Sequence, residues 1–235
     1  MSFFKDMISV FKKRELTFLE RREESEGVHS FLFEKPQDVT WRAGQHGLFT
    51  ITHKKVRNST KPFTLSSAPA ENIVQITTLI KDEPSEFKQA LLELKHGMNI
   101  KMSGPVGSFH LKENRPAILI AGGIGITPYR SILKQLKAEG RYNEKQLNLL
   151  YMSNKMPYIF KEELGEMAEN HVMNVKYVDS RDHLHEYIDK FITLYQNNGD
   201  YFVAGPKSMV DSISVDLRSK NISKRNITKD GFFGY

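Results

Sequence analysis

Four short stretches of this 235-residue sequence carry residue types from which a binding site could be built. Residues 61–69 (KPFTLSSAP) combine a lysine, an aromatic ring and several hydroxyls. Residues 121–128 (AGGIGITP) and 202–208 (FVAGPKS) contain glycine and proline directly after apolar runs, and residues 230–235 (DGFFGY) end the chain on aromatic rings. A cation, a flat face and small donors together suit an anionic ligand that contains a planar ring.

The glycine-rich stretch suits a phosphate-bearing ligand. Gly123 and Gly125 allow a tight turn and a close approach of the backbone, and Thr127 can cap the helix that follows. The N–H groups at the start of that helix would then face a diphosphate. The stretch is neither G-x-G-x-x-G nor a P-loop, so a tight connection without a ligand is equally open. For Gly205 and Pro206 this simpler interpretation is favoured.

Two interpretations are open for the other two stretches. Lys61 and Phe63 are either a surface lysine and a core ring, or a phosphate ligand and a stacking partner with Thr64 donating to a heteroatom on the edge of the stacked ring. Chain ends are usually polar and frayed. The terminal rings therefore either complete a core or cover a flat ligand.

The elements that must position these residues change in character near residues 112–116. Before this point, short β-like runs separated by turn residues predict a small antiparallel barrel or sandwich. One helical pattern, at residues 87–94, has Ser85 as its predicted N-cap and Gly97 as the residue just beyond its end.

After Pro116, strands, turns and helices alternate, which is typical of a parallel, doubly wound sheet. Ligands bind beyond the carboxyl ends of such strands, where three of the glycine- and proline-rich turns lie. We expect a β + α/β two-domain fold, with an amphipathic segment over residues 1–14, an antiparallel β-barrel over 15–112 and an α/β domain over 113–235. The amphipathic segment either lies on a membrane surface or packs on the protein body or a partner.

Composition narrows the function classes. The net charge of +6 comes without a compact basic block, which argues against nucleic acid and suits phosphorylated cofactors or an acidic protein partner. The absence of cysteine excludes disulfides, iron–sulfur clusters and a cysteine nucleophile on this chain, and it favours a cytoplasmic location. The sequence contains no run of about 18 apolar residues, so no membrane span is predicted. The histidines form no tight ligand pair, so no metal site is expected.

Taken in order, these stretches resemble the ferredoxin–NADP(H) reductase superfamily, in particular its compact bacterial stand-alone members whose chains end in D-x-F-x-G-Y. The resemblance runs from Leu16 to Tyr235. It rests on WRAGQ (41–45), KPFTLSS, the S-x-F helix start at Ser85, GPVGSF (104–109), AGGIGITP, LLYMSNK (149–155), AGP (204–206) and DGFFGY. The resemblance implies an FAD-binding β-barrel followed by an NAD(P)-binding α/β domain.

For the flavin, the family motif Arg-x-Tyr-Ser/Thr corresponds to Lys61, Phe63 and Thr64. The resemblance implies that Lys61 holds the FAD diphosphate, that Phe63 stacks on one flavin face and that Thr64 reaches N5. Lysine keeps the charge but not the bidentate fork of arginine, so we expect weaker FAD binding. Four further implied residues close on the diphosphate or line the flavin: Ser85, Leu65, Thr78 and Ile80.

For the nicotinamide, the resemblance implies that Gly123, Gly125 and Thr127 receive the diphosphate and nicotinamide, and that Gly205 and Pro206 lie beneath the ring. Phe232 would cover the other flavin face, with Asp230 nearby. The implied catalytic candidates are Thr64, Asp230 and Phe232.

The sequence also bears on the choice between NADPH and NADH. Ser180 and Arg181, with Tyr187 nearby, resemble a site for a 2′-phosphate and adenine, which favours NADPH over NADH. The alternative is that Arg181 is a solvated loop residue.

The implied function is hydride transfer from NAD(P)H to FAD, followed by electron transfer to a separate acceptor such as ferredoxin, flavodoxin or another redox protein. A separate acceptor is expected because the chain has no cysteine for an iron–sulfur cluster of its own. Two rival interpretations are a flavin- or nucleotide-binding sensor without turnover, and a redox subunit docked on a membrane through residues 1–14.

Overall fold

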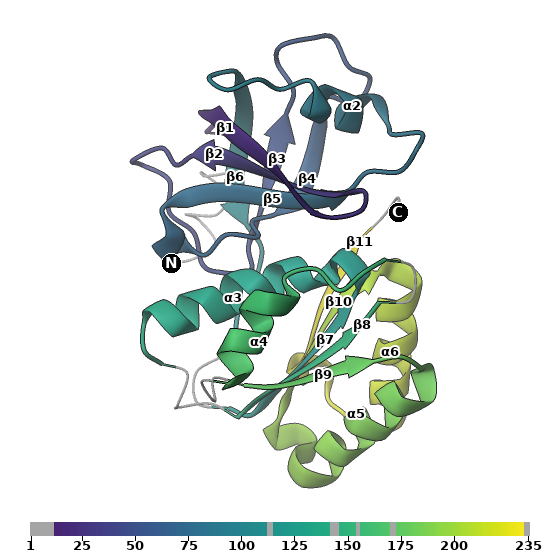
Figure 1. The fold of residues 1–235 in the computed structure, drawn as a ribbon. Helices are drawn as coiled ribbons and strands as arrows, with labels where there is room; N and C mark the ends of the chain where they lie inside the picture. Colours follow the sequence, from purple (N-terminus) through teal and green to yellow (C-terminus); the bar gives the residue numbers. More distant parts are fainter. Residues whose placement is uncertain (1–11, 112–114, 142–145, 154–155, 170–172, 233–235) are drawn as a thin grey trace. The chain divides into compact units, whose positions relative to one another are not determined.

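The computed structural model describes residues 12–111, 115–141, 146–153, 156–169 and 173–232. The chain divides into two compact units between His110 and Leu111 (Figure 1). The first unit is built on an antiparallel sheet and the second on a parallel sheet with helices, so the predicted β + α/β fold class is confirmed. The amphipathic segment proposed for residues 1–14 lies almost wholly outside the described residues.

The first unit contains one six-stranded antiparallel sheet of order β4-β3-β6-β1-β2-β5. Its strands are β1 Arg14–Ser25, β2 Val28–Glu34, β3 His46–Thr50, β4 Thr60–Thr64, β5 Ile73–Leu79 and β6 Asn99–Val106. Two short helical segments accompany them, η1 Pro69–Glu71 and α2 Glu86–Leu92. Aromatic residues from two strands, Phe31 and Phe33 of β2 and Phe49 of β3, are completely buried in the core of this unit.

The two ends of this sheet, β4 and β5, are joined by the chain that follows β4 rather than by a strand ladder. The backbone N–H of Ser66 donates to the carbonyl of Gln75 at 2.8 Å, and the N–H of Gln75 donates to Ser67 Oγ at 3.0 Å. Thr77 Oγ1 lies 2.9 Å from Ser66 Oγ and 2.7 Å from Ser30 Oγ. These buried hydroxyls form hydrogen bonds with one another. The unit is therefore barrel-like, and we call the junction between β4 and β5 the seam.

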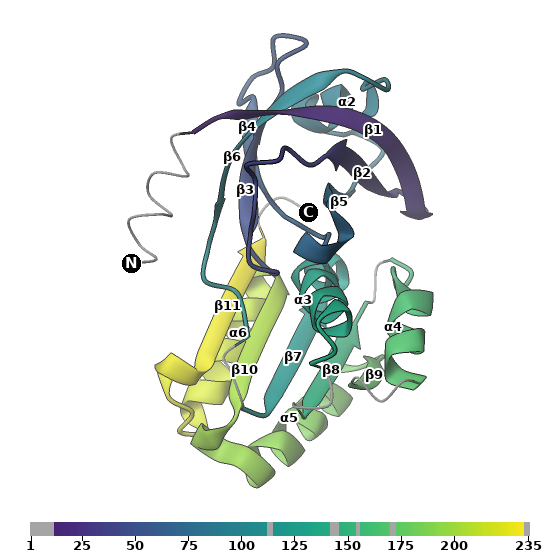
Figure 2. The same cartoon turned by 90° about the vertical axis from the view of Figure 1, so that its left-hand side faces the viewer.

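The second unit contains a five-stranded parallel sheet of order β11-β10-β7-β8-β9. Its strands are β7 Ala117–Gly122, β8 Leu147–Met152, β9 Asn174–Val178, β10 Asp200–Pro206 and β11 Ile227–Phe232. Its helices are α3 Thr127–Ala138, α4 Lys161–Glu169, α5 Arg181–Tyr195 and α6 Lys207–Ser219, with short turns η2 Gly123–Ile126, η4 Gln196–Asn198 and η5 Lys224–Asn226. Helices α3 and α4 cover one face of the sheet, and α5 and α6 cover the other (Figures 1 and 2).

This strand order reverses direction between β7 and β10. Counted from β7, it is the 3-2-1-4-5 order of doubly wound dinucleotide-binding folds, in which ligands bind outside the carboxyl ends of the strands where the order reverses. A ligand site is therefore expected at the turns after β7 and β10.

Three local predictions are wrong in detail. The helix after Ser85 ends at Leu92, so Gly97 lies in a later turn, where its N–H donates to Phe18 O at 2.9 Å. Thr127 does not cap a helix but is the first residue of α3, and its hydroxyl donates to Ile124 O at 3.1 Å. Helix α5 begins at Arg181, so Arg181 is the first residue of a helix and not a loop residue.

Strand β11 was not predicted as a strand, because Lys229, Asp230 and Gly231 interrupt its apolar pattern. It pairs in parallel with β10, with Ala204 opposite Asp230 and Pro206 opposite Phe232. The two interpretations of the terminal aromatic residues concern Phe232 and residues 233–235. Residues 233–235 lie outside the described residues. Phe232 is half-buried at the end of this edge strand.

His46, at the start of β3, gives the first unit a predictable response to acid. Burial lowers the pKa of His46 below its ordinary value, so the folded state favours the neutral ring. Stability from this group is complete above the unfolded pKa of about 6.5 and is lost as the pH falls below it. We expect the free energy of unfolding to decrease between pH 7 and pH 5, with a smaller decrease in His46→Gln. Urea unfolding at several pH values measures this decrease in the free energy of unfolding. His96→Gln, at an exposed position, is the control, and an equal acid response in both variants would contradict the prediction.

Candidate functional site

The first group of candidate residues lies on β4, at one edge of the seam. Lys61 and Phe63 are two residues apart and therefore point to the same face of the strand. The Phe63 ring stacks on Phe87 with centroids 5.6 Å apart and planes inclined by 26°, and it meets Phe49 edge-on at 6.0 Å. The core-packing interpretation of Phe63 is thus observed, although its ring stays partly exposed.

Helix α2 connects the two edges of the seam. Its residue Phe87 contacts β4 through Phe63, and its residue Lys88 contacts β5, because Lys88 Nζ donates to Leu79 O at 2.7 Å. Ser85 is the N-cap, as predicted, and its hydroxyl accepts the N–H of Lys88 at 3.4 Å. The candidate residues of the first unit therefore all border this seam: Lys61, Phe63, Thr64 and Leu65 on the β4 side, Thr78 and Ile80 on the β5 side, and Ser85 at the start of α2.

The polar groups at the seam suit an anion with a ring. Lys61 is half-exposed and makes no hydrogen bond or ion pair within the described residues. Thr64 is buried and projects to the strand face opposite Phe63, and Leu65 is anchored by its N–H, which donates to Gln45 O at 3.0 Å. A cation, a partly exposed ring and buried hydroxyls are the donor set that a flavin dinucleotide requires, so these residues fit that group.

The sequence did not single out Lys88, whose ammonium lies at the β5 edge of the seam. Burial, and secondarily the charge of Lys81, lower the pKa of Lys88. In the sequence, Lys88 looks like one of the polar residues of a surface helix, and no periodicity distinguishes it from its exposed neighbour Gln89.

The second group of candidate residues lies at the carboxyl ends of β7 and β10. A methyl group built on Gly125 would lie 2.2 Å from Ala204 O, and one built on Gly205 would lie 3.0 Å from Gly122 O. The two turns are therefore in backbone-to-backbone contact, and only glycine allows this approach. Gly123 differs, because it has a left-handed φ of 53° and an added methyl group would have its nearest neighbour at Met156 sulfur, 3.6 Å away. That side of the turn therefore has room for a methyl group, in van der Waals contact with Met156.

The terminal strand brings its candidates to the same place. Asp230 and Phe232 lie beside Ala204 and Pro206 in the ladder between β10 and β11. Tyr129, the third residue of α3, is completely buried beneath these turns and donates its hydroxyl to Ile120 O at 3.1 Å. Burial, with a smaller effect of the Asp230 charge, raises the pKa of Tyr129, so its phenol stays protonated. The structure thus gathers Gly123, Gly125, Thr127, Gly205, Pro206, Asp230 and Phe232 at three neighbouring strand ends.

Ser180 and Arg181 lie at the carboxyl end of β9, two strands away from β7. At about 4.8 Å per strand, this separation is roughly 10 Å. Ser180 caps α5 by accepting the N–H of His183 at 3.2 Å, and Arg181 is exposed. His183 Nδ1 lies 2.9 Å from the Asp179 carboxylate, which raises the pKa of His183.

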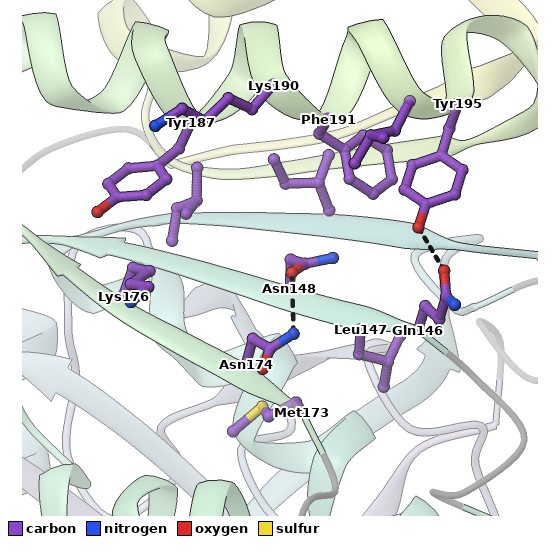
Figure 3. A pocket seen from close by; sticks show the side chains of 13 residues that line it. Gln146, Leu147, Asn148, Met173, Asn174, Lys176, Tyr187, Lys190, Phe191 and Tyr195 are labelled. Carbon is purple, nitrogen blue, oxygen red and sulfur yellow. Dashed lines mark hydrogen bonds between the residues drawn. The ribbon is translucent and has the colours of Figure 1, made fainter.

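Tyr187 does not lie beside Ser180 and Arg181 as expected. It lines a pocket of about 590 Å³ between α5 and the sheet, and the ammonium of Lys190 lies 5.4 Å from the centre of its ring (Figure 3). Residues from the amino-terminal ends of β8 and β9 line the pocket, and there Asn174 donates to Asn148 at 3.3 Å. These strand ends are opposite the glycine turns, and among the residues that line the pocket Tyr187 alone was associated with a cofactor from the sequence.

Comparison with known proteins agrees with this geometry. Residues 119–214 match the family model described as "Oxidoreductase NAD-binding domain". The toluate 1,2-dioxygenase electron transfer component of Pseudomonas putida is 27% identical over 188 residues, which cover 74% of this chain and 54% of the relative.

Two solved structures share the fold over nearly the whole chain. Ferredoxin–NADP+ reductase from Plasmodium falciparum has a TM-score of 0.80 at 19% identity, covering 94% of this chain and 96% of that one. The flavohem-like FAD/NAD-binding domain of nitric oxide dioxygenase from Vibrio cholerae has a TM-score of 0.76 at 21% identity, covering 93% and 98%. The resemblance inferred from the motifs is confirmed in its fold and in its NAD-binding domain.

The chain is shorter than several relatives. It spans between 54% and 66% of the length of four curated proteins that it matches. Within the described residues, no helix has the length and apolar character that crossing a membrane requires.

Proposed function

We propose that this chain, whose residues 119–214 form an oxidoreductase NAD-binding domain within a ferredoxin–NADP reductase fold, is an NAD(P)H-dependent FAD reductase that passes electrons to a separate acceptor. The observation that carries the proposal is the backbone contact of Gly125 with β10 where the strand order reverses. This contact builds a nucleotide-binding turn in one unit, while the other unit has a cationic seam that suits a flavin.

In the first unit, the proposed flavin residues have distinct tasks. Lys61 supplies a positive charge for the diphosphate, Phe63 presents a ring face, and Thr64 presents a buried hydroxyl toward N5. When bound, FAD supplies the chemistry by accepting a hydride and releasing electrons singly. The residues of this chain bind and orient the flavin, and none of them has to carry a proton for hydride transfer.

In the second unit, the proposed dinucleotide follows the carboxyl edge of the sheet. Gly123 provides backbone for the approach of a diphosphate, and Gly205 and Pro206 form the floor for the nicotinamide. Phe232, on the neighbouring strand, is the ring proposed to cover one face of the flavin, with Asp230 nearby. Ser180 and Arg181 lie about two strand spacings away, a separation that an extended dinucleotide can span, and Arg181 supplies a cation for a 2′-phosphate.

An absorbance spectrum followed by an anaerobic titration tests this function. We expect the purified protein, supplied with FAD, to show a bound flavin spectrum that is bleached by stoichiometric NADPH more readily than by NADH. Arg181→Gln should raise the half-saturating NADPH concentration by about tenfold, the effect of losing one charge-assisted contact, and leave NADH unchanged. A bound flavin that neither nucleotide bleaches would contradict the proposal and favour the sensor interpretation.

The separate acceptor is a proposal that relatives support. One relative is named as the electron transfer component of a dioxygenase, and the absence of cysteine in this sequence leaves no ligands for an iron–sulfur cluster on the chain itself. The net charge of +6 suits an acidic redox protein, such as a ferredoxin or a flavodoxin, as the acceptor. Docking on a membrane through residues 1–14 remains the alternative for how such an assembly would form.

A further inference from the structure

We propose that the pocket between α5 and the sheet of the second unit binds a mononucleotide. Its volume of about 590 Å³ is within the range of small-molecule sites. Residues of β7, β8 and β9 line it on one side and residues of α5 on the other (Figure 3). The pocket is at the strand ends opposite the turns proposed for the cofactor, so this inference goes beyond the proposed function and does not depend on it.

The floor of the pocket is polar, although a sheet face covered by a helix is normally apolar. Asn148 and Asn174 are opposite one another in the ladder between β8 and β9, and Lys176 is two residues further along β9 on the same face. The next residue of that row, Val178, is buried, whereas Asn174 and Lys176 are exposed. Helix α5 therefore packs closely on β9 only near the carboxyl end of the strand, and polar side chains line the space that remains.

The two asparagines present a hydrogen-bond donor beside an acceptor. Asn174 Nδ2 donates to Asn148 Oδ1 at 3.3 Å. The amide nitrogen of Asn148 and the amide oxygen of Asn174 have no partner among the residues that the structure describes. An amide donor next to an amide acceptor is complementary to the edge of a nucleobase, on which donors and acceptors are also adjacent.

Tyr187 and Lys176 add a ring and a charge at one end of the pocket. Because α5 runs back along β9, its first pocket residue, Tyr187, lies at the same end as the last pocket residue of β9, Lys176 (Figure 3). Within the described part of the chain, Tyr187 contacts no other aromatic ring and Lys176 makes no ion pair, whereas Lys190 is held by Glu186 at 2.6 Å. Tyr187 can therefore stack on a base, and Lys176 is the cation that a phosphate would meet.

Calorimetric titration with AMP, GMP and UMP tests the inference, in the presence of saturating NADP+ so that the turns proposed for the cofactor are filled. We expect at least one nucleotide to bind with a Kd below about 1 mM. Lys176→Gln should weaken this binding by about tenfold, because one charge-assisted contact is lost, and Lys176→Arg should restore most of it. Asn174→Leu should weaken it by about fivefold or more. Lys161→Gln, at an exposed lysine that begins α4 on the other face of the sheet, is the matched control and should change it less than about twofold.

A second measurement uses the protein without substitutions. Acetylation of lysines, read by peptide mass spectrometry, should be blocked at Lys176 by the bound nucleotide but not by the nucleoside that lacks its phosphate, with Lys161 labelled in both cases. Absence of binding by all three nucleotides, unchanged affinity in Lys176→Gln, or labelling of Lys176 in the presence of bound nucleotide would each overturn the inference. A protein that binds no NADP+ would contradict the proposed function alone, because the dependence of nucleotide binding on Lys176 would still decide whether this pocket is the site.

Discussion

Replacing Gly125 by alanine is expected to unfold or severely destabilise the second unit. The added methyl group would lie 2.2 Å from Ala204 O, 2.5 Å from Ala204 C and 2.7 Å from Gly205 Cα, all of which are backbone atoms of β10. Because β10 is a central strand held between β7 and β11, it cannot move aside without breaking its ladders. We expect a loss of at least about 3 kcal/mol in the free energy of unfolding, with loss of dinucleotide binding.

Two other glycines of the same unit make this prediction specific. Gly165, in α4, has no atom within 4 Å of an added methyl group, so Gly165→Ala should stabilise the unit by about 0.5–1 kcal/mol. Gly123→Ala should cost about 1–2 kcal/mol, because its φ of 53° disfavours alanine although space is available. Thermal and urea unfolding followed by circular dichroism should rank the proteins in that order. A Gly125→Ala protein within about 1 kcal/mol of wild type would contradict the backbone contact.

Substitution of Phe63 is expected to have the largest effect on the first unit. Phe63→Ala removes the ring contacts with Phe87 and Phe49, which should cost about 2–3 kcal/mol of stability for a partly exposed ring. If the same ring also stacks on a flavin, FAD binding should weaken by a further factor of about 3 to 10. Unfolding by urea and titration with FAD measure the two effects.

The Phe63→Leu variant distinguishes the contribution of Phe63 to core packing from its proposed stacking on a flavin. Leucine fills much of the same core space, so it should cost no more than about 1.5 kcal/mol, but it offers no flat face to a flavin. We expect FAD affinity in Phe63→Leu to fall as it does in Phe63→Ala. Phe63→Tyr should keep the stability and tighten FAD binding several-fold through its added hydroxyl. Wild-type FAD affinity in the leucine variant would assign Phe63 to the core alone.

Features set by local sequence were predicted correctly. The change from alternating β patterns to strand–turn–helix units near residues 112–116 indicated the β + α/β order, because side-chain periodicity depends only on neighbouring residues. Ser85 was identified as an N-cap for the same reason, since a cap bonds within its own first turn. The glycine turns were found as turns, with a diphosphate as one of two open interpretations.

The tertiary structure decided what those residues meet. Gly125 is required by the backbone of β10, Ser66 and Gln75 close the seam, and Lys88 reaches the end of β5. Each of these contacts joins elements that are separate in the chain, so no local pattern encodes it. Strand β11 escaped prediction for a related reason. Its sequence is too polar to be recognised as a strand, and its conformation is stabilised by the ladder that β10 provides.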